Sequence, residues 1–231
     1  LSPSICSRVV AATPLCYLQV RVRKGPAKGA RWTLLPFSFN WRQGGEGDLA
    51  CGLARLDRVR GAVCWDFGAH FGIHTVGMAL QVGPEGQVVS FEPDPVAFER
   101  LSFHVRLNRL KNVVLFKAAV SNSNGRVGMI AVHGQGSTLS HLRYPGEAEP
   151  QANDEFFVES IAPDTLVESG QIRRPDLIKV DVQGHGASAI AGSIQSIRAS
   201  RPVIAFSGHG PAELEGARSL LEPLNYAVES L

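Results

Sequence analysis

"CWDFGAHFGIHT" (residues 64–75) ends a short apolar run at Asp66, and small residues follow that acid at once. A loop after a buried strand must turn sharply, and small residues allow a ligand to approach the backbone because no Cβ atom blocks it. The helix that follows adds partial positive charge at its N-terminus. We therefore interpret Gly68, Ala69 and Gly72 as part of a ligand-binding loop after the first strand of a sheet.

Apolar runs recur downstream of this loop and alternate with segments of helical period. The runs are AVCW (62–65), VVSF (88–91), VVLF (113–116), LIKV (177–180) and VIAF (203–206). They do not alternate with polar residues, as is typical of parallel strands covered on both faces. One helical segment carries Ala187, Ile190, Ile194 and Ile197, and YAV (226–228) is expected to form a last strand. The pattern predicts an α/β fold with a doubly wound, mostly parallel sheet.

Two regions break this rhythm. Residues 17–50 contain two strand-like runs around a Gly/Pro/Lys turn and are predicted to form an N-terminal β-hairpin. Residues 121–163 are predicted to form a second hairpin, inserted between the third and fourth strands, that covers the active site. We expect residues 1–60 to be an extension packed on the core, and residues 61–231 to be one compact domain.

Composition places the chain among ordinary globular proteins. Of its 231 residues 44% are hydrophobic and 19% charged, and the net charge of +2 gives no general reason to expect a nucleic-acid partner. The local basic cluster reads as a solvated hairpin; its members are Arg21, Arg23, Lys24, Lys28 and Arg31. The four cysteines form no CxxC pair, no stretch approaches a membrane span, and Arg8 interrupts the apolar start. These features favour a cytoplasmic location, although the chain could begin inside a longer protein.

The glycine spacing narrows the choice of ligand. A GxGxxG fingerprint starting at Gly68 fails, and no GxxxxGK[ST] motif is present. The chain instead has D-x-G-x-x-x-G over residues 66–72, and Glu92 ends the second strand, where a carboxylate can accept both hydroxyls of a ribose. This combination suits S-adenosylmethionine. The alternative is a loop that merely turns, with Glu92 as a solvated strand-end acid.

Four ordered motifs, spread over about residues 25–230, resemble the FkbM-type S-adenosylmethionine-dependent methyltransferases. They are DFGAHFG, VVSFEPDPVAFERL, KAAVSNSNG and PDLIKVDVQGHGASAIAGS. The resemblance implies a Rossmann-like sheet of the seven-stranded methyltransferase type, with S-adenosyl-L-methionine as cofactor. It also implies O-methylation of a hydroxyl on a sugar, polyketide or related metabolite.

The resemblance also assigns site residues. Those expected to contact the cofactor are Glu46 in GGEGD, Asp66, Gly68, Ala69, His70, Gly72, Glu92, Pro93 and Ala119. His70 replaces the Asn of the family's GANiG. Both glutamates of its DVEGxE motif are absent, since Gln183 and Gly186 occupy those positions, and Ser207 stands where the family often has Glu.

Candidates for chemistry lie just past the predicted strand ends. Asp181 ends the fourth strand, beside the expected methyl group, although a strand-end acid can also simply cap the next helix. His185 and His209 belong to the same rim, and histidine titrates near neutral pH. We predict Asp181, His185 and His209 as catalytic residues and His185 as the preferred base. We expect no bound metal, because the histidine spacing matches no known ligand pattern.

Two interpretations follow from these residues. The first is an active O-methyltransferase acting on a small-molecule or glycosyl hydroxyl. The second is a diverged domain that binds S-adenosylmethionine without turnover and acts as a binding or interaction module. A nucleic-acid methyltransferase is a weaker option, because the position of an NPPY-type tetrapeptide reads DVQG (181–184).

Overall fold

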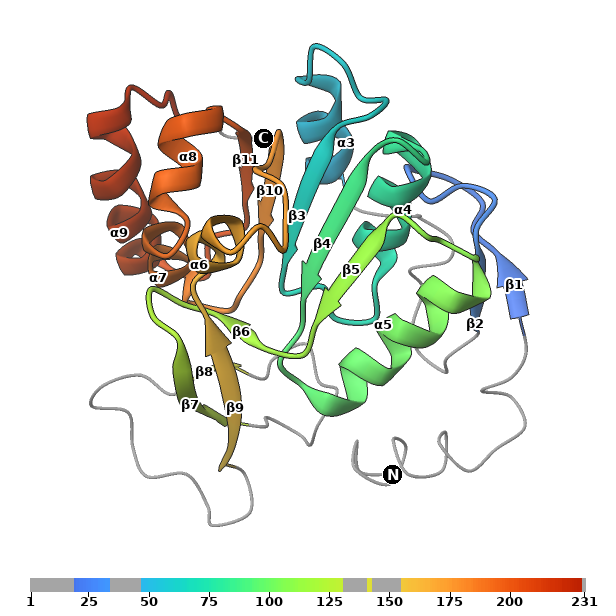
Figure 1. The fold of residues 1–231 in the computed structure, drawn as a ribbon, viewed down its shortest axis with the longest axis horizontal. Coiled ribbons are helices and arrows are strands. Elements are labelled where there is room, and N and C mark those ends of the chain that lie inside the picture. Colours follow the sequence, from blue (N-terminus) through green and yellow to red (C-terminus); the bar gives the residue numbers. More distant parts are fainter. Residues whose placement is uncertain (1–18, 34–46, 131–140, 143–154, 230–231) are drawn as a thin grey trace.

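A computed structural model describes residues 19–33, 47–130, 141–142 and 155–229 of the chain, and its central sheet has five parallel strands (Figure 1). The strands are β3 (Val63–Phe67), β4 (Gln87–Phe91), β5 (Val113–Phe116), β10 (Leu177–Val180) and β11 (Val203–Phe206), in the order β11-β10-β3-β4-β5. Each neighbouring pair is parallel. The five predicted runs are thereby confirmed as strands. The expected seven-stranded count is not confirmed.

Helices cover both faces of this sheet, as the doubly wound prediction requires. They are α3 (Gly47–Ala54), α4 (Ile73–Val82), α5 (Pro95–Leu107), α6 (Pro163–Glu168), α7 (Gly186–Ala191), α8 (Ile194–Ser200) and α9 (Pro211–Leu221), followed by the 3-10 turn η2 (Glu222–Leu224). Helices α6 to α9 pack on one face and α3 with α4 on the other. No helix within these described residues is long and apolar enough to cross a membrane.

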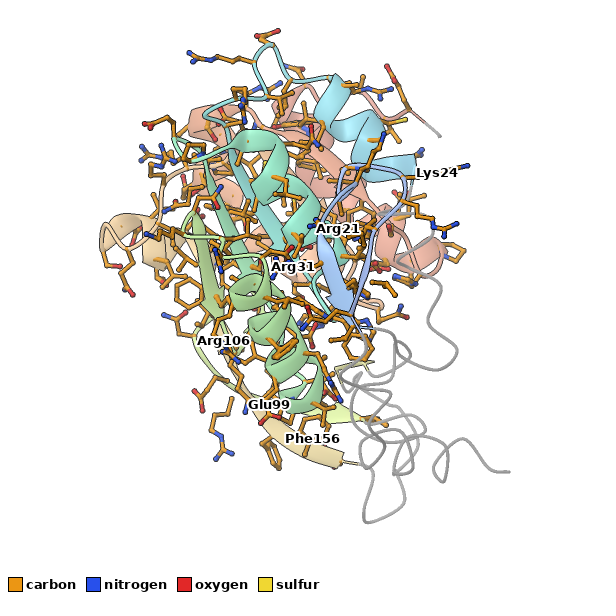
Figure 2. The ribbon with its side chains drawn as sticks, turned by 90° about the vertical axis from the view of Figure 1, so that its right-hand side faces the viewer. Arg21, Lys24, Arg31, Glu99, Arg106 and Phe156 are labelled. Atoms are coloured by element: carbon orange, nitrogen blue, oxygen red, sulfur yellow. The ribbon has the colours of Figure 1, made fainter. Side chains whose placement is uncertain are left out.

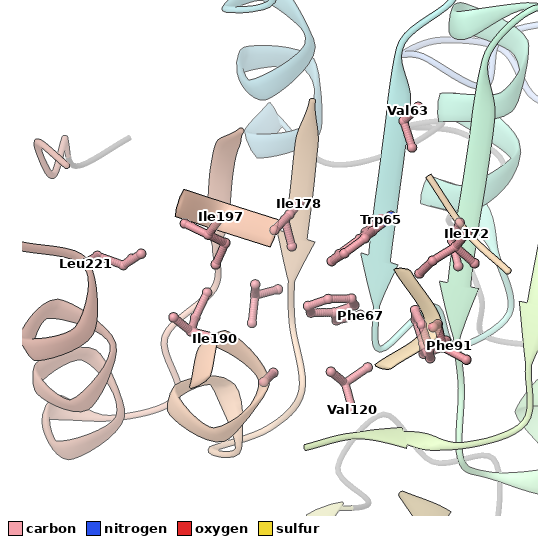
Figure 3. Close-up of a cluster of buried hydrophobic side chains, with 14 residues drawn as sticks. Val63, Trp65, Phe67, Phe91, Val120, Ile172, Ile178, Ile190, Ile197 and Leu221 are labelled. Atoms are coloured by element: carbon pink, nitrogen blue, oxygen red, sulfur yellow. The ribbon is translucent and has the colours of Figure 1, made fainter. Parts of the chain in front are cut away.

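Alternate residues of β3 face the two layers of the core. Trp65 and Phe67 lie in the cluster with Ile190 of α7 (Figure 3). Cys64 instead packs in the cluster with residues of α3 and α4. The Phe67 and Phe91 rings meet edge to face with centroids 5.5 Å apart. Because β3 is buried on both sides, its sequence lacks the alternation of a half-exposed strand. This burial fixes the strand end from which the loop at residues 68–72 departs.

A small antiparallel hairpin lies beside α5, as predicted for residues 17–50. Its strands are β1 (Gln19–Arg21) and β2 (Arg31–Thr33). Figure 2 shows Arg21, Lys24 and Arg31 of the hairpin region on the same face as Arg106 of α5. Asn108 ties the two together, since its amide accepts from the Arg31 N–H at 2.7 Å and donates to the Arg31 carbonyl at 2.8 Å.

His104 of α5 joins the hairpin to the loop after β3. Its ring stacks on Trp32 at 3.7 Å between centroids, Nδ1 donates to the Phe71 carbonyl at 2.8 Å, and Nε2 lies 2.7 Å from the Thr33 hydroxyl. The carbonyl requires a proton on Nδ1, so Nε2 accepts from the hydroxyl. His104 is fully buried, and burial lowers its pKa to about 4. His104 therefore has a structural role, since its ring is buried between the hairpin and the loop.

The stability of the fold is therefore expected to depend on pH through His104. The folded pKa lies below the unfolded value of 6.5, so this contribution is complete above pH 6.5 and is lost as the pH falls toward 4. The loss should reach about 2 kcal/mol of unfolding free energy at pH 5 and about 3 kcal/mol below pH 4. Urea unfolding at pH 7.5 and pH 5 measures it. The His104→Gln variant should be less stable at pH 7.5 and should show a smaller loss on acidification; an equal loss would contradict the assignment.

A second sheet precedes β10 in the chain, where the insertion was predicted. Its strands are β6 (Ala119–Val120), β7 (Gly125–Ile130), β8 (His141–Leu142) and β9 (Glu155–Ile161), in the order β6-β9-β7-β8. The antiparallel pairing of β7 with β9 confirms the predicted hairpin. Figure 1 shows this sheet beyond the edge at which β3 and β4 end. Residues 131–140 and 143–154 lie outside the described part of the chain.

Two sequence predictions differ from the structure. The helical segment of residues 187–197 is split between α7 and α8. At the break the Gly192 carbonyl accepts the Asp164 N–H at 3.0 Å, and the Asp164 carboxylate accepts the N–H groups of Gln195 and Ser196 at the start of α8. The expected strand at residues 226–228 is wrong. Tyr226 instead donates its hydroxyl to the Pro202 carbonyl at 2.9 Å, and the Arg201 guanidinium lies 4.5 Å from its ring centre.

Candidate functional site

The loop after β3 turns sharply at the end of β4. The N–H groups of Gly68 and Ala69 both donate to the Phe91 carbonyl, at 3.1 and 3.0 Å. His70 has a φ of 49° and Gly72, which precedes α4, has a φ of 90°. The left-handed conformations at these positions produce the turn that the sequence predicted.

Gly68 has to be a glycine because of its backbone conformation and a neighbouring segment of the chain. Its φ is 76°, and a Cβ atom at this position would lie 1.9 Å from the Asp181 carbonyl oxygen. The sequence interpretation attributed this glycine to the approach of a ligand. The structure gives a different physical reason, because the backbone after β10 already occupies the space next to it.

Glu92 closes the loop from the end of β4. Its Oε2 accepts the His70 N–H at 2.7 Å and its Oε1 accepts the Asp94 N–H at 2.9 Å. The residue is only 5% exposed. Burial raises the pKa of Glu92 to about 7, although the two backbone hydrogen bonds act in the opposite direction. Each carboxylate oxygen retains a further lone pair for a ligand hydroxyl.

Lys179 lies in β10 between two acids and was not singled out by the sequence interpretation. Its Nζ donates to the Gly68 carbonyl at 2.9 Å and lies 3.3 Å from Asp66 Oδ1 and 3.6 Å from Asp181 Oδ2. Burial lowers the pKa of the ammonium, but the two carboxylates outweigh it and the net change is upward. A cation within a buried parallel strand, the Lys of LIKV, was the signal that could have revealed it.

Asp66 contacts other residues of the protein and is not exposed at the candidate site. Its side chain is fully buried, and Oδ2 accepts from the Thr75 hydroxyl at 2.6 Å. With Lys179 on its other oxygen, Asp66 joins β3 to α4 and β10. Asp66 therefore supports the loop from behind, and its contact with a cofactor stays a prediction.

Asp181 and His209 form the direct pair at the ends of β10 and β11. His209 Nε2 lies 2.8 Å from Asp181 Oδ1, and both side chains are partly exposed. Burial raises the pKa of Asp181, but the Lys179 charge and the His209 hydrogen bond outweigh it, so the net change is downward. Asp181 is therefore held as a carboxylate at neutral pH.

The hydrogen-bond partner of the His185 ring is Ser121, not Asp181 or His209. Its Nε2 is 3.5 Å from the Ser121 hydroxyl, next to the inserted sheet. Burial lowers the pKa of His185, although Glu213 opposes the change. The structure thus gives His209, rather than the preferred candidate His185, the contact with Asp181.

Glu213 is the second residue that the sequence interpretation missed. It lies in the first turn of α9, is 7% exposed, and accepts the N–H groups of Gly186 and His209, both at 2.7 Å. Its position two residues after a proline gave no signal of its own, because acids are common in the first turn of helices.

The remaining predicted residues have varied surroundings. Pro93 is partly buried beside Glu92, whereas Ala119 is buried in the cluster of Met129 and Val158 and offers no side-chain surface to a ligand. Glu46 lies outside the described residues. Among the residues that are described, no group of three or more His, Cys, Asp or Glu side chains is arranged to hold a metal ion.

Comparison of the sequence with known proteins identifies relatives of this chain. The family described as "Methyltransferase FkbM domain" matches residues 66–227. The hexuronic acid methyltransferase AglP of Haloferax volcanii is 27% identical over 62% of this chain and 54% of its own. The 2-O-methyltransferase NoeI of Sinorhizobium fredii is 30% identical over 53% of this chain and 54% of its own. The chain thus matches about half the length of these curated relatives.

A solved structure shares the fold. The methyltransferase FkbM of Methylobacillus flagellatus superposes with a TM-score of 0.51 at 18% sequence identity, over 70% of this chain and 37% of that one. At this identity the likeness concerns the fold alone. It agrees with the α/β architecture built from the sequence.

Proposed function

The chain belongs to the FkbM methyltransferase family, and from this premise we propose that it transfers a methyl group from S-adenosylmethionine to a hydroxyl of a sugar or sugar-like metabolite. The family implies the cofactor, and the two curated relatives have names that specify a hexuronic acid and a 2-O position. The observation that carries the proposal is the Asp181–His209 pair beside the Gly68 loop.

The residues at the end of β4 fit the nucleoside end of this cofactor. Glu92 has acceptor capacity beyond its two backbone partners and can take the two ribose hydroxyls. We assign the backbone of residues 68–72 to the cofactor as well. When bound, S-adenosylmethionine supplies an activated methyl group on sulfur.

His209 and Asp181 fit the acceptor end. If Nε2–H is donated to the Asp181 carboxylate, Nδ1 keeps its lone pair and can accept the proton of the acceptor hydroxyl. The carboxylate then orients the ring and stabilises the imidazolium that forms. We therefore propose His209 as the base, Asp181 as its partner, and His185 as a polar residue of the same rim. The role of the β7–β9 hairpin as a cover for the acceptor remains a prediction.

Cofactor binding is expected to weaken in mild acid through Glu92. The ionised carboxylate accepts two hydroxyls, whereas its protonated form loses acceptor capacity, and the pKa of about 7 lies between the two test conditions. S-adenosylhomocysteine should bind about tenfold more weakly at pH 6 than at pH 8. In Glu92→Gln the affinity should fall by about 1.5–3 kcal/mol and lose this pH dependence. Calorimetry measures both, and an unchanged pH dependence in the variant would refute the ribose assignment.

The methyl transfer itself is tested with a panel of acceptors. Uronic acids, neutral sugars and their glycosides are incubated with S-adenosylmethionine, and S-adenosylhomocysteine release is measured together with the mass of the product. The expected result is a gain of one methyl group on a sugar hydroxyl. Cofactor binding without product across this panel would favour the alternative, a binding domain without turnover.

A further inference from the structure

Glu213 connects the two loops that carry the acceptor side of the site. Its Oε1 accepts the Gly186 N–H in the segment after β10, and its Oε2 accepts the His209 N–H in the loop after β11. Both distances are 2.7 Å, and the side chain is buried. Hydrogen bonds from backbone N–H groups to a buried carboxylate are stronger than those between neutral groups. One side chain of α9 therefore fixes the main chain at two points.

The Glu213 carboxylate occupies space that a side chain at position 186 would need. A Cβ atom at Gly186 would lie 2.7 Å from Glu213 Oε1 and 2.6 Å from the Phe206 ring. In the FkbM pattern this position is a glutamate. The site has thus lost an acid from the segment after β10 but contains another at nearly the same place, contributed by α9.

His209 is consequently held at both ends. Glu213 binds its backbone N–H at 2.7 Å, and Asp181 binds its ring at 2.8 Å. If either of these two hydrogen bonds is lost, the loop after β11 can move the imidazole away from Asp181. Small displacements of a catalytic group reduce rates strongly, since proton transfer needs hydrogen-bond distance to the reacting hydroxyl.

We propose that Glu213 is a positioning residue that holds His209 against Asp181, in place of the acid absent at position 186. The inference rests on the proposed function, because it assigns to His209 the acceptance of the substrate proton. It also has a consequence that does not depend on activity. The Gly186 and His209 amide protons are protected from solvent exchange by one shared carboxylate.

The test compares Glu213→Gln with Glu215→Gln. Glu215 lies on the same helix and is exposed, so its replacement makes the same change of charge without touching the loops. The carboxamide of Gln has one acceptor oxygen, so either the Gly186 N–H or the His209 N–H loses its partner in Glu213→Gln. Amide exchange by NMR, S-adenosylhomocysteine affinity, and kcat with the acceptor found in the sugar panel are measured for both variants and for His209→Gln.

We expect Glu213→Gln to speed exchange at the Gly186 or His209 amide at least tenfold and to lower kcat about tenfold or more, with cofactor affinity within twofold. The double variant with His209→Gln should be no slower than His209→Gln alone, since both changes remove one function. Glu215→Gln should match the wild type. Unchanged exchange, or losses of kcat that multiply in the double variant, would overturn the proposal.

Two further outcomes keep the inference separate from the proposed function. If no acceptor is methylated, the proposed function fails, and the exchange rates still decide whether Glu213 orders both loops. If Glu213→Gln does not fold, Gly186→Ala tests the same contact from the other side, because its methyl group would displace the Glu213 carboxylate. Gly186→Ala should then lower kcat about tenfold or more, as expected for Glu213→Gln; wild-type kcat in this variant would overturn the proposal.

Discussion

Gly68→Ala is expected to destabilise the protein by about 4 kcal/mol or more. The left-handed φ of 76° disfavours a residue with a side chain, at a cost of about 1–2 kcal/mol. The methyl group would also overlap the Asp181 carbonyl, which is backbone and cannot rotate away. The loop after β3 and the segment after β10 would have to separate, and the Lys179 contact to the Gly68 carbonyl would be lost with them.

Gly29→Ala provides the matched control. Its φ is 88°, but an added Cβ atom would have nothing within 4 Å. Only the cost of the left-handed backbone conformation therefore applies. Urea unfolding should therefore place Gly29→Ala about 1–2 kcal/mol below the wild type. If the two variants lose the same stability, the close approach between Gly68 and Asp181 is not the reason for the glycine.

His209→Gln is expected to lower kcat at least about a hundredfold, with S-adenosylhomocysteine affinity within a few-fold of the wild type. A general base contributes roughly 10²–10⁴ in rate. The glutamine amide can still donate to Asp181 but cannot accept the acceptor's proton at pH 7. Steady-state kinetics with the acceptor found in the sugar panel, together with calorimetry, separate the two effects.

The comparison variant is His185→Gln, which tests the other candidate base. Its imidazole lies against Ser121 rather than Asp181, so we expect less than a tenfold loss of kcat. A hundredfold loss in His185→Gln with wild-type kcat in His209→Gln would reverse the assignment and restore the base that sequence reasoning preferred.

The strands of the central sheet were predictable because burial on both faces leaves a simple signal. The central strands β3, β4 and β10 are almost wholly buried. The runs VVLF and VIAF are apolar throughout and form the edge strands β5 and β11, which are partly buried. The break in the helix at Gly192 was not predictable, since the hydrogen bonds at the break come from Asp164, nearly thirty residues earlier in the chain. The same holds for Tyr226, whose partners at residues 201 and 202 are set by tertiary packing.

The site was predictable where local spacing determines it. The loop at residues 68–72 and Glu92 at a strand end are both near in sequence to the strands that position them. Lys179 and Glu213 were missed because their roles depend on partners from other strands and helices. The proposal of His209 over His185 likewise rests on the distance to Asp181, which no spacing in the sequence encodes.

The bond from Lys179 to the Gly68 carbonyl joins residues 111 positions apart and has a consequence for biosynthesis. A ribosome completes β3 and β4, the strands whose ends we propose to bind the nucleoside, long before β10 emerges. Until then the loop after β3 lacks both its cation and the neighbouring carbonyl of Asp181. Contacts of such high sequence separation form late and slow the folding reaction. We therefore expect the nascent chain to gain no protection from the cofactor until residues 177–181 have been synthesised.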